Sequence, residues 1–106
     1  MSAFCDDDFD PIFYAKTMPK FYATEHNGDQ AIAQYKFISV TSGWAWYCLE
    51  FYPATRTFFG LVNGFEMELG YFSLDEMAGV PGIIRDRKFQ PTPIGIIKSQ
   101  LHARNA

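Results

Sequence analysis

Three segments of the chain alternate large apolar residues with other residues, and this alternation most limits what the chain can fold into. The alternating segments are residues 32–40, 44–52 and 65–72, and a further run rich in β-forming residues covers 57–62. A period of two sends successive side chains to opposite faces of a β-strand, so each segment predicts a strand. Ser42-Gly43 and Asn63-Gly64 lie between them and are typical of tight turns. The pattern therefore predicts an antiparallel β-meander.

The strands contain more aromatic residues than one buried sheet face needs, since the chain has 11 Phe, 6 Tyr and 2 Trp. We expect one face to form the core with Tyr35, Phe37, Tyr47, Leu49 and Phe51. The opposite face is then predicted to contain Trp44, Trp46, Tyr52 and Phe58. Two interpretations of this second face stay open: other segments cover it, or it is an aromatic patch that anchors a protein partner.

Helix signals follow the strands. Ser73 and Glu76 have the spacing of a capping box, which predicts a short helix that ends before Gly79. Residues 83–89 predict an edge strand. Thr92 is then expected to cap a C-terminal helix with Pro93 in its first turn, and the apolar stripe of that helix comprises Ile94, Ile97 and Leu101.

Before the meander, residues 21–25 predict a short strand, and Asn27-Gly28 predicts a turn. The fold class is α+β, with an antiparallel β-meander of four to six strands and one or two short helices. We expect a single domain over residues 19–106, preceded by an N-terminal arm over residues 1–18.

The arm is acidic and aromatic. Its acidic residues are Asp6, Asp7, Asp8 and Asp10, and the apolar residues expected to anchor it are Phe9, Ile12, Phe13 and Tyr14. With Pro11 among them, the segment is predicted to be irregular. The aspartates are either a solvated surface or a contact that steers a basic partner toward the protein.

The charge of the whole chain disfavours direct binding of nucleic acid. Twelve acidic and nine basic residues give a formal charge of −3, and no basic stripe is present to replace the counterions of a phosphate backbone. No apolar run has the length of a membrane span, and the first residues lack the pattern of a secretion signal, so we expect a cytoplasmic protein without membrane contact. Cys5 and Cys48 are predicted to be free thiols.

Several segments occur in an order that resembles domain-of-unknown-function family 2958. They are residues 21–25, Trp46-Tyr47 with Glu50-Phe51, residues 58–62 with Gly64, residues 66–74 and Arg85-Asp86. The similarity covers about Pro19 to Thr92 and is most specific in residues 68–74. It implies a small bacterial protein of the kind found on plasmids, phages and integrative elements, and it brings no mechanism. Ile84 departs from the pattern, because an acidic residue precedes the Arg-Asp pair in similar proteins.

Carboxylates provide the main enzymatic hypothesis. Glu66 and Glu68 share one face of a strand, and Glu50 joins them if its strand is adjacent. Such a group acts as general acid and base or binds a divalent metal, which would make the chain a small hydrolase or nuclease-like enzyme, with Arg85-Asp86 as further candidates. The alternative is a solvated face paired with Lys36 or Arg56.

No metal site or cofactor is expected. The cluster at residues 25–29 contains His26, but the only other histidine is His102, near the far end of the chain. No phosphate loop or dinucleotide-binding motif is present.

The leading hypothesis is a non-enzymatic protein–protein interaction protein of mobile-element origin, with inhibition of a host nucleic-acid-processing or defence complex as a special case. Its predicted contact residues are Asp6, Asp7, Asp8, Asp10, Trp44, Trp46 and Phe58. A homodimer or other structural oligomer is a further hypothesis.

Overall fold

The computed structural model describes residues 7–20 and 25–105 and arranges them around one antiparallel sheet. The elements are η1 (Asp7–Phe9), α2 (Pro11–Thr17), η2 (Glu25–Gln30), β1 (Ile32–Ala33), β2 (Tyr35–Ser39), β3 (Ala45–Tyr52), β4 (Thr57–Asn63), β5 (Met67–Ser73), α3 (Leu74–Ala78), β6 (Ile83–Arg85), β7 (Thr92–Pro93) and α4 (Ile94–Asn105). Together they form one compact α+β domain.

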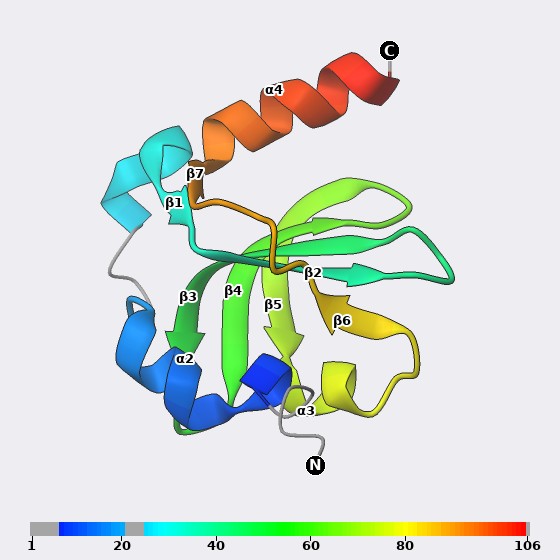
Figure 1. Cartoon of the computed structure of the whole chain (residues 1–106). Helices are drawn as coiled ribbons and strands as arrows, with labels where there is room; N and C mark the ends of the chain where they lie inside the picture. The colour runs from blue at the N-terminus through cyan, green and yellow to red at the C-terminus, as the bar shows by residue number, and fades with distance from the viewer. Residues whose placement is uncertain (1–6, 21–24, 106) are drawn as a thin grey trace.

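The main sheet has five strands in the order β5-β4-β3-β2-β6, all antiparallel (Figure 1). Strands β2 to β5 follow one another as a meander, and β6 returns to pair with the free side of β2. A second sheet joins β1 to β7. The predicted α+β meander of four to six strands is therefore confirmed.

Each face of the main sheet carries a buried cluster, which accounts for much of the high aromatic content. Elements η1, α2 and α3 lie on one side in Figure 1, and α4 lies on the other. The first cluster comprises Tyr14, Met18, Phe37, Cys48, Phe51, Phe58, Leu74, Met77 and Ile83. The second comprises Ala31, Ala33, Ala45, Tyr47, Leu49, Leu61, Ile94, Ile97 and Leu101. We call these two sides the α2 face and the α4 face.

A β-bulge at Leu49 overturns the predicted grouping of core residues. Cys48 aligns with Gly60 and Glu50 with Phe59, so Leu49 is an extra residue in β3. The alternation shifts there, and Phe51 packs on the α2 face while Leu49 packs on the α4 face.

The register between β2 and β3 corrects the same grouping. Phe37 aligns with Trp46, and Lys36 aligns with Tyr47. Directly opposed residues share a sheet face, so Phe37 lies on the side of Trp46, away from Tyr47. Alternation within each strand was visible in the sequence, but the pairing that joins one strand's face to the next was not.

The N-terminal segment is a helix, which corrects the expected irregular arm. Asp10 caps α2, because its side chain accepts a 2.9 Å hydrogen bond from the Ile12 amide. Pro11 starts the helix, where its missing N–H costs nothing. Tyr14 is completely buried against the sheet, so this segment supplies part of the core.

The remaining elements match the predictions in part. The Ser73 side chain accepts a 3.1 Å hydrogen bond from the Glu76 amide and caps α3 as expected. The stripe of α4 is buried as predicted. Thr92 does not cap α4: it lies in β7, and its hydroxyl donates to the Gln90 carbonyl at 2.7 Å.

Three predicted strands differ from the structure. The predicted strand over residues 32–40 divides into β1 and β2, because β1 pairs with β7 while β2 pairs with β3. The edge strand predicted over residues 83–89 ends at Arg85. Residues 21–24 of the predicted first strand lie outside the described residues, and Glu25 opens η2 instead.

Candidate protein-binding surface

Phe65, at the tip of the β4–β5 hairpin, is 94% exposed. Asn63 aligns with Met67, and the connection Gly64-Phe65-Glu66 is closed by a 3.1 Å hydrogen bond from the Gly64 amide to the Glu66 carbonyl. The alternation over residues 65–72 predicts Phe65 as the first residue of a strand. The structure places it in the turn, where its ring projects into solvent.

The ring of Phe65 is held by Trp44. The two ring centroids are 5.2 Å apart in an edge-to-face arrangement. Gly64 permits this packing, because a Cβ atom there would lie 2.6 Å from the Trp44 ring. The ring centroid of Trp44 in turn lies 6.2 Å from that of Trp46. The exposed phenylalanine therefore ends a row of aromatic rings that continues into the sheet.

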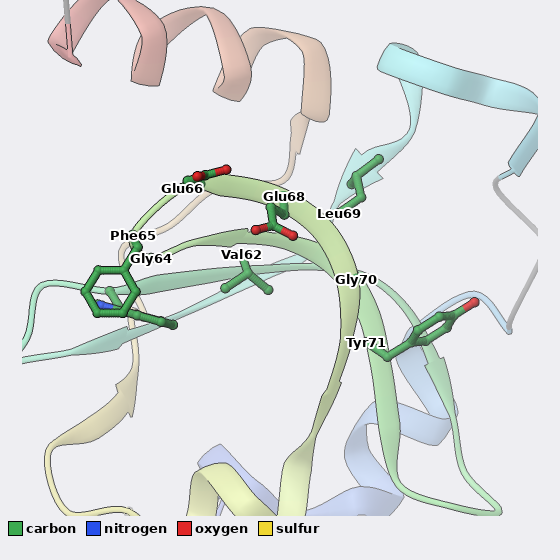
Figure 2. Close-up of a pocket in the computed structure, with 9 residues that line it drawn as sticks. Val62, Gly64, Phe65, Glu66, Glu68, Leu69, Gly70 and Tyr71 are labelled. Atoms are coloured by element: carbon green, nitrogen blue, oxygen red, sulfur yellow. The ribbon is translucent and has the colours of Figure 1, made fainter.

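A hollow of about 350 Å³ lies beside this row, along β5 (Figure 2). It is lined by Trp44, Val62, Gly64, Phe65, Glu66, Glu68, Leu69, Gly70 and Tyr71. Leu69 and Tyr71 are about half exposed, and Glu66 and Glu68 are exposed. Neither glutamate takes part in the salt bridges found among the described residues. We call this surface the hairpin surface; it combines apolar side chains with two acidic ones.

The aspartates predicted to contact a partner hold the fold together where the structure describes them. Asp8 forms a salt bridge with Arg87, and its other oxygen accepts a 3.5 Å hydrogen bond from the Arg85 amide. Asp10 caps α2. Of Asp7 only the backbone is described, in η1, and Asp6 lies outside the described residues. Asp8 and Asp10 thus have partners within the chain, contrary to the expected open acidic contact.

The predicted aromatic contacts separate into two groups. Trp44 and Trp46 are partly exposed and belong to the row beside Phe65. Phe58 is completely buried, with its ring 4.8 Å from that of Phe51 and 5.5 Å from that of Phe72. Its inclusion in an exposed patch was wrong, because α2 covers this face and Tyr14 packs on the ring of Phe58.

The three glutamates of the enzymatic hypothesis are not brought together. Glu50 is 3% exposed and aligns with Phe59, which packs on the α4 face. Glu68 aligns with Val62, which aligns with Trp46 on the α2 face. Glu50 and Glu68 therefore belong to opposite sides of the sheet, and only Glu66 and Glu68 line the hollow.

Arg85 and Asp86, the further candidates of the enzymatic hypothesis, both make contacts within the fold. The Arg85 guanidinium lies 5.1 Å from the ring centroids of Phe13 and Tyr35 and donates a 3.3 Å hydrogen bond to the Tyr14 hydroxyl. Asp86 forms a salt bridge with Lys36, with 3.9 Å between its carboxylate oxygen Oδ2 and the lysine Nζ.

Other candidate groups are occupied or buried. Asp29, from the histidine-containing cluster, pairs with Lys98 at 3.0 Å. Within residues 7–20 and 25–105, no three metal-ligating side chains come together. Burial raises the pKa of the Cys48 thiol well above its ordinary value of 9.0, which opposes formation of a reactive thiolate.

No helix in the described part of the chain is long and apolar enough to cross a membrane.

The local sequence signal favours a different loop from the one observed. An Asn-Gly pair is typical of a two-residue loop, which would make Phe65 the first residue of the next strand. In the structure Asn63 pairs with Met67, so the loop is Gly64-Phe65-Glu66.

No protein-family model, no curated protein and no solved structure matches the chain.

Proposed function

We propose that this chain is a non-enzymatic protein-binding module and that the hairpin surface makes the contact. The observation that supports this most directly is Phe65, a 94% exposed aromatic side chain whose ring packs against Trp44. A side chain this exposed removes little apolar surface from water on folding, whereas aromatic anchors dominate the energetics of protein interfaces. The contact with Trp44 restricts the ring before binding, so less conformational entropy is lost when a partner covers it.

The chemistry of the hairpin surface favours a protein partner over nucleic acid. Aromatic rings on a sheet also stack on bases, but such sites need surrounding cations to bind phosphates. The charged residues that line this hollow are Glu66 and Glu68. A protein partner supplies both an apolar pocket for Phe65 and cations for the two carboxylates.

The biological setting of the proposal rests on the resemblance to family 2958. On that basis the module is of mobile-element origin and acts in the cytoplasm, where the free thiol of Cys48 is stable. Inhibition of a host nucleic-acid-processing or defence complex is the special case that suits a small acidic protein, because such a protein is attracted to basic surfaces that bind DNA or RNA.

Affinity capture with a matched control tests this proposal. Tagged wild-type protein, Phe65→Ala and Ile12→Ala are each incubated with bacterial lysate, and the captured proteins are quantified by mass spectrometry. Ile12 is a suitable control, because it is 63% exposed and lies on α2 instead of the hairpin. Loss of an interface aromatic typically costs about 2 kcal/mol, or roughly thirtyfold in affinity.

We expect at least one protein to be captured by wild type and Ile12→Ala and to be lost with Phe65→Ala. A capture profile that is identical for all three proteins would contradict the proposal. Glu66→Gln/Glu68→Gln addresses the enzymatic hypothesis: a variant that keeps its partner and loses biological activity would favour catalysis.

A further inference from the structure

Strand β5 lies at one edge of the five-stranded sheet. The strand order places β4 on one side of it, and no other strand of the described residues pairs with its second side. An open edge presents backbone donors and acceptors that an added strand can satisfy. β5 is seven residues long, which is sufficient for such pairing.

The register identifies which backbone groups face outward. The Gly64 amide bonds to the Glu66 carbonyl, and the Leu74 amide bonds to the Arg56 carbonyl. These bonds mark hydrogen-bonded pairs at both ends of the β4–β5 ladder, and such pairs alternate along an antiparallel ladder. The even-numbered residues of β5 therefore bond to β4. The N–H and C=O groups of Met67 and Leu69 point toward the second side of β5.

The side chains along this edge divide by face. Leu69, about half exposed, aligns with Leu61 and lies on the α4 face. Glu68 lies on the α2 face. Gly70 separates these two residues from Tyr71, and a Cβ atom built on Gly70 would meet nothing within 4 Å. Among the described residues, nothing therefore blocks the approach of a backbone at Gly70, and the two preceding residues present Leu69 on one face and Glu68 on the other (Figure 2).

Charge distinguishes between possible occupants of this edge. A second copy would bring another Glu66 and Glu68 to an edge that already has two acids, in a chain of net charge −3. Acidic residues on an edge oppose self-pairing of this kind. A strand with basic side chains instead gains favourable contacts with both glutamates.

We infer that the partner contributes an extended segment of alternating basic and apolar residues, which pairs with β5 as a sixth strand of the main sheet. This inference rests on the proposed function and specifies its partner. Apolar side chains of the segment contact Leu69 on the α4 face, and basic side chains contact Glu68 on the α2 face. Phe65 contacts the partner beyond the end of the added strand.

A synthetic peptide tests the pairing without knowledge of the natural partner. The probe is a fluorescein-labelled peptide of alternating Val and Lys with the length of β5, and the control peptide alternates Val and Glu. Binding to the full-length protein is measured by fluorescence anisotropy. We expect the lysine peptide to bind at least tenfold more tightly, and its affinity to fall as ionic strength rises.

Backbone methylation of the probe tests the hydrogen bonds. Two versions of the lysine peptide bear N-methyl groups on alternate residues, one on the odd set and one on the even set. An added strand bonds to β5 through only one set of amides. We expect one version to lose at least tenfold in affinity and the other to keep it. Equal affinity of the two versions would overturn the inference, as would equal binding of the glutamate peptide.

A pair of variants tests the same contact from the protein side. Leu69→Pro removes an outward N–H donor, which an edge strand tolerates, whereas Leu69→Ala removes the apolar side chain and keeps the donor. We expect Leu69→Pro to bind the lysine peptide at least tenfold less tightly than Leu69→Ala. Circular dichroism checks that both variants fold, and the methylated peptides decide the question if Leu69→Pro does not.

Two further outcomes separate this inference from the proposed function. A concentration-dependent dimer in analytical ultracentrifugation that Leu69→Pro abolishes would overturn the inference, because a second copy would then occupy the edge. Capture of a partner that depends on Phe65 but is unchanged in Leu69→Pro would leave the proposed function in place and refute the added strand.

Discussion

The hydroxyl group of Tyr14 donates a 2.6 Å hydrogen bond to the main-chain oxygen of Asp8. The same hydroxyl accepts a 3.3 Å hydrogen bond from Arg85, which lies 71 residues further along the chain. Helix α2 is thereby joined both to η1 before it and to the edge strand β6. The ring of Tyr14 contacts those of Phe37, Phe51 and Phe58. The N-terminal segment is therefore a layer of the core.

Replacing Tyr14 by phenylalanine is expected to lower the free energy of unfolding by about 1–2 kcal/mol. The substitution keeps the ring and removes both hydrogen bonds of the buried hydroxyl. Urea denaturation measures the change. Ile12→Ala, at an exposed position of the same helix, should change stability by no more than about 0.5 kcal/mol. An unchanged midpoint for Tyr14→Phe would mean that the two hydrogen bonds contribute nothing.

Stability is expected to fall at alkaline pH because of Cys48 and Tyr14. Burial raises the pKa of the Cys48 thiol above its ordinary 9.0 and that of the Tyr14 hydroxyl above its ordinary 10.0. When the pH exceeds those ordinary pKa values, the thiol and the hydroxyl lose their protons in the unfolded chain but keep them in the folded chain. The folded state then binds more protons, so stability decreases as pH rises, by up to about 1.4 kcal/mol per pH unit for each group.

Urea denaturation at about pH 8 and about pH 10.5 measures this loss, and the variant Tyr14→Phe/Cys48→Ala is the comparison. Neither replacement residue titrates, so the variant should lose less stability between the two pH values than wild type. An equal loss in both proteins would assign the alkaline sensitivity to other groups.

Two neighbouring glycines are expected to respond oppositely to alanine. A Cβ atom on Gly60 would lie 1.8 Å from the Tyr47 carbonyl oxygen, beside the bulge in β3, so Gly60→Ala should destabilise by about 2 kcal/mol or more. Gly70 is its direct partner in β5, with open space at the same point. Gly70→Ala should be neutral or stabilise by up to about 1 kcal/mol. Thermal unfolding of the two variants checks the contrast.

Asp10 is expected to matter for stability and to be neutral for partner binding. Asp10→Ala removes the N-cap of α2 and should cost about 1 kcal/mol in chemical denaturation. Asp10→Ser keeps a capping oxygen without the charge and should restore most of that stability. If both variants instead slow association with a captured partner equally, the charge of Asp10 takes part in steering.

Local sequence patterns were sufficient to predict β2 to β5 and their succession as a meander. A period of two in the side chains predicted β2, β3 and β5, a run of β-forming residues predicted β4, and Ser42-Gly43 and Asn63-Gly64 predicted turns. The spacing of Ser73 and Glu76 predicted the cap of α3. These features depend on contacts between residues a few positions apart, and the same physical chemistry applies to them in any fold.

Which faces meet and which residues remain exposed depends on contacts between distant parts of the chain. The bulge at Leu49 moves Phe51 to the α2 face, and α2 buries Phe58, so neither position follows from its own strand. Asp8 is held by Arg87, 79 residues away. Phe65 is the most exposed large apolar side chain in the described part of the chain, because it lies in a three-residue loop and its ring packs on Trp44. Strand register and long-range packing set these positions, and both depend on contacts between segments that are far apart in the sequence.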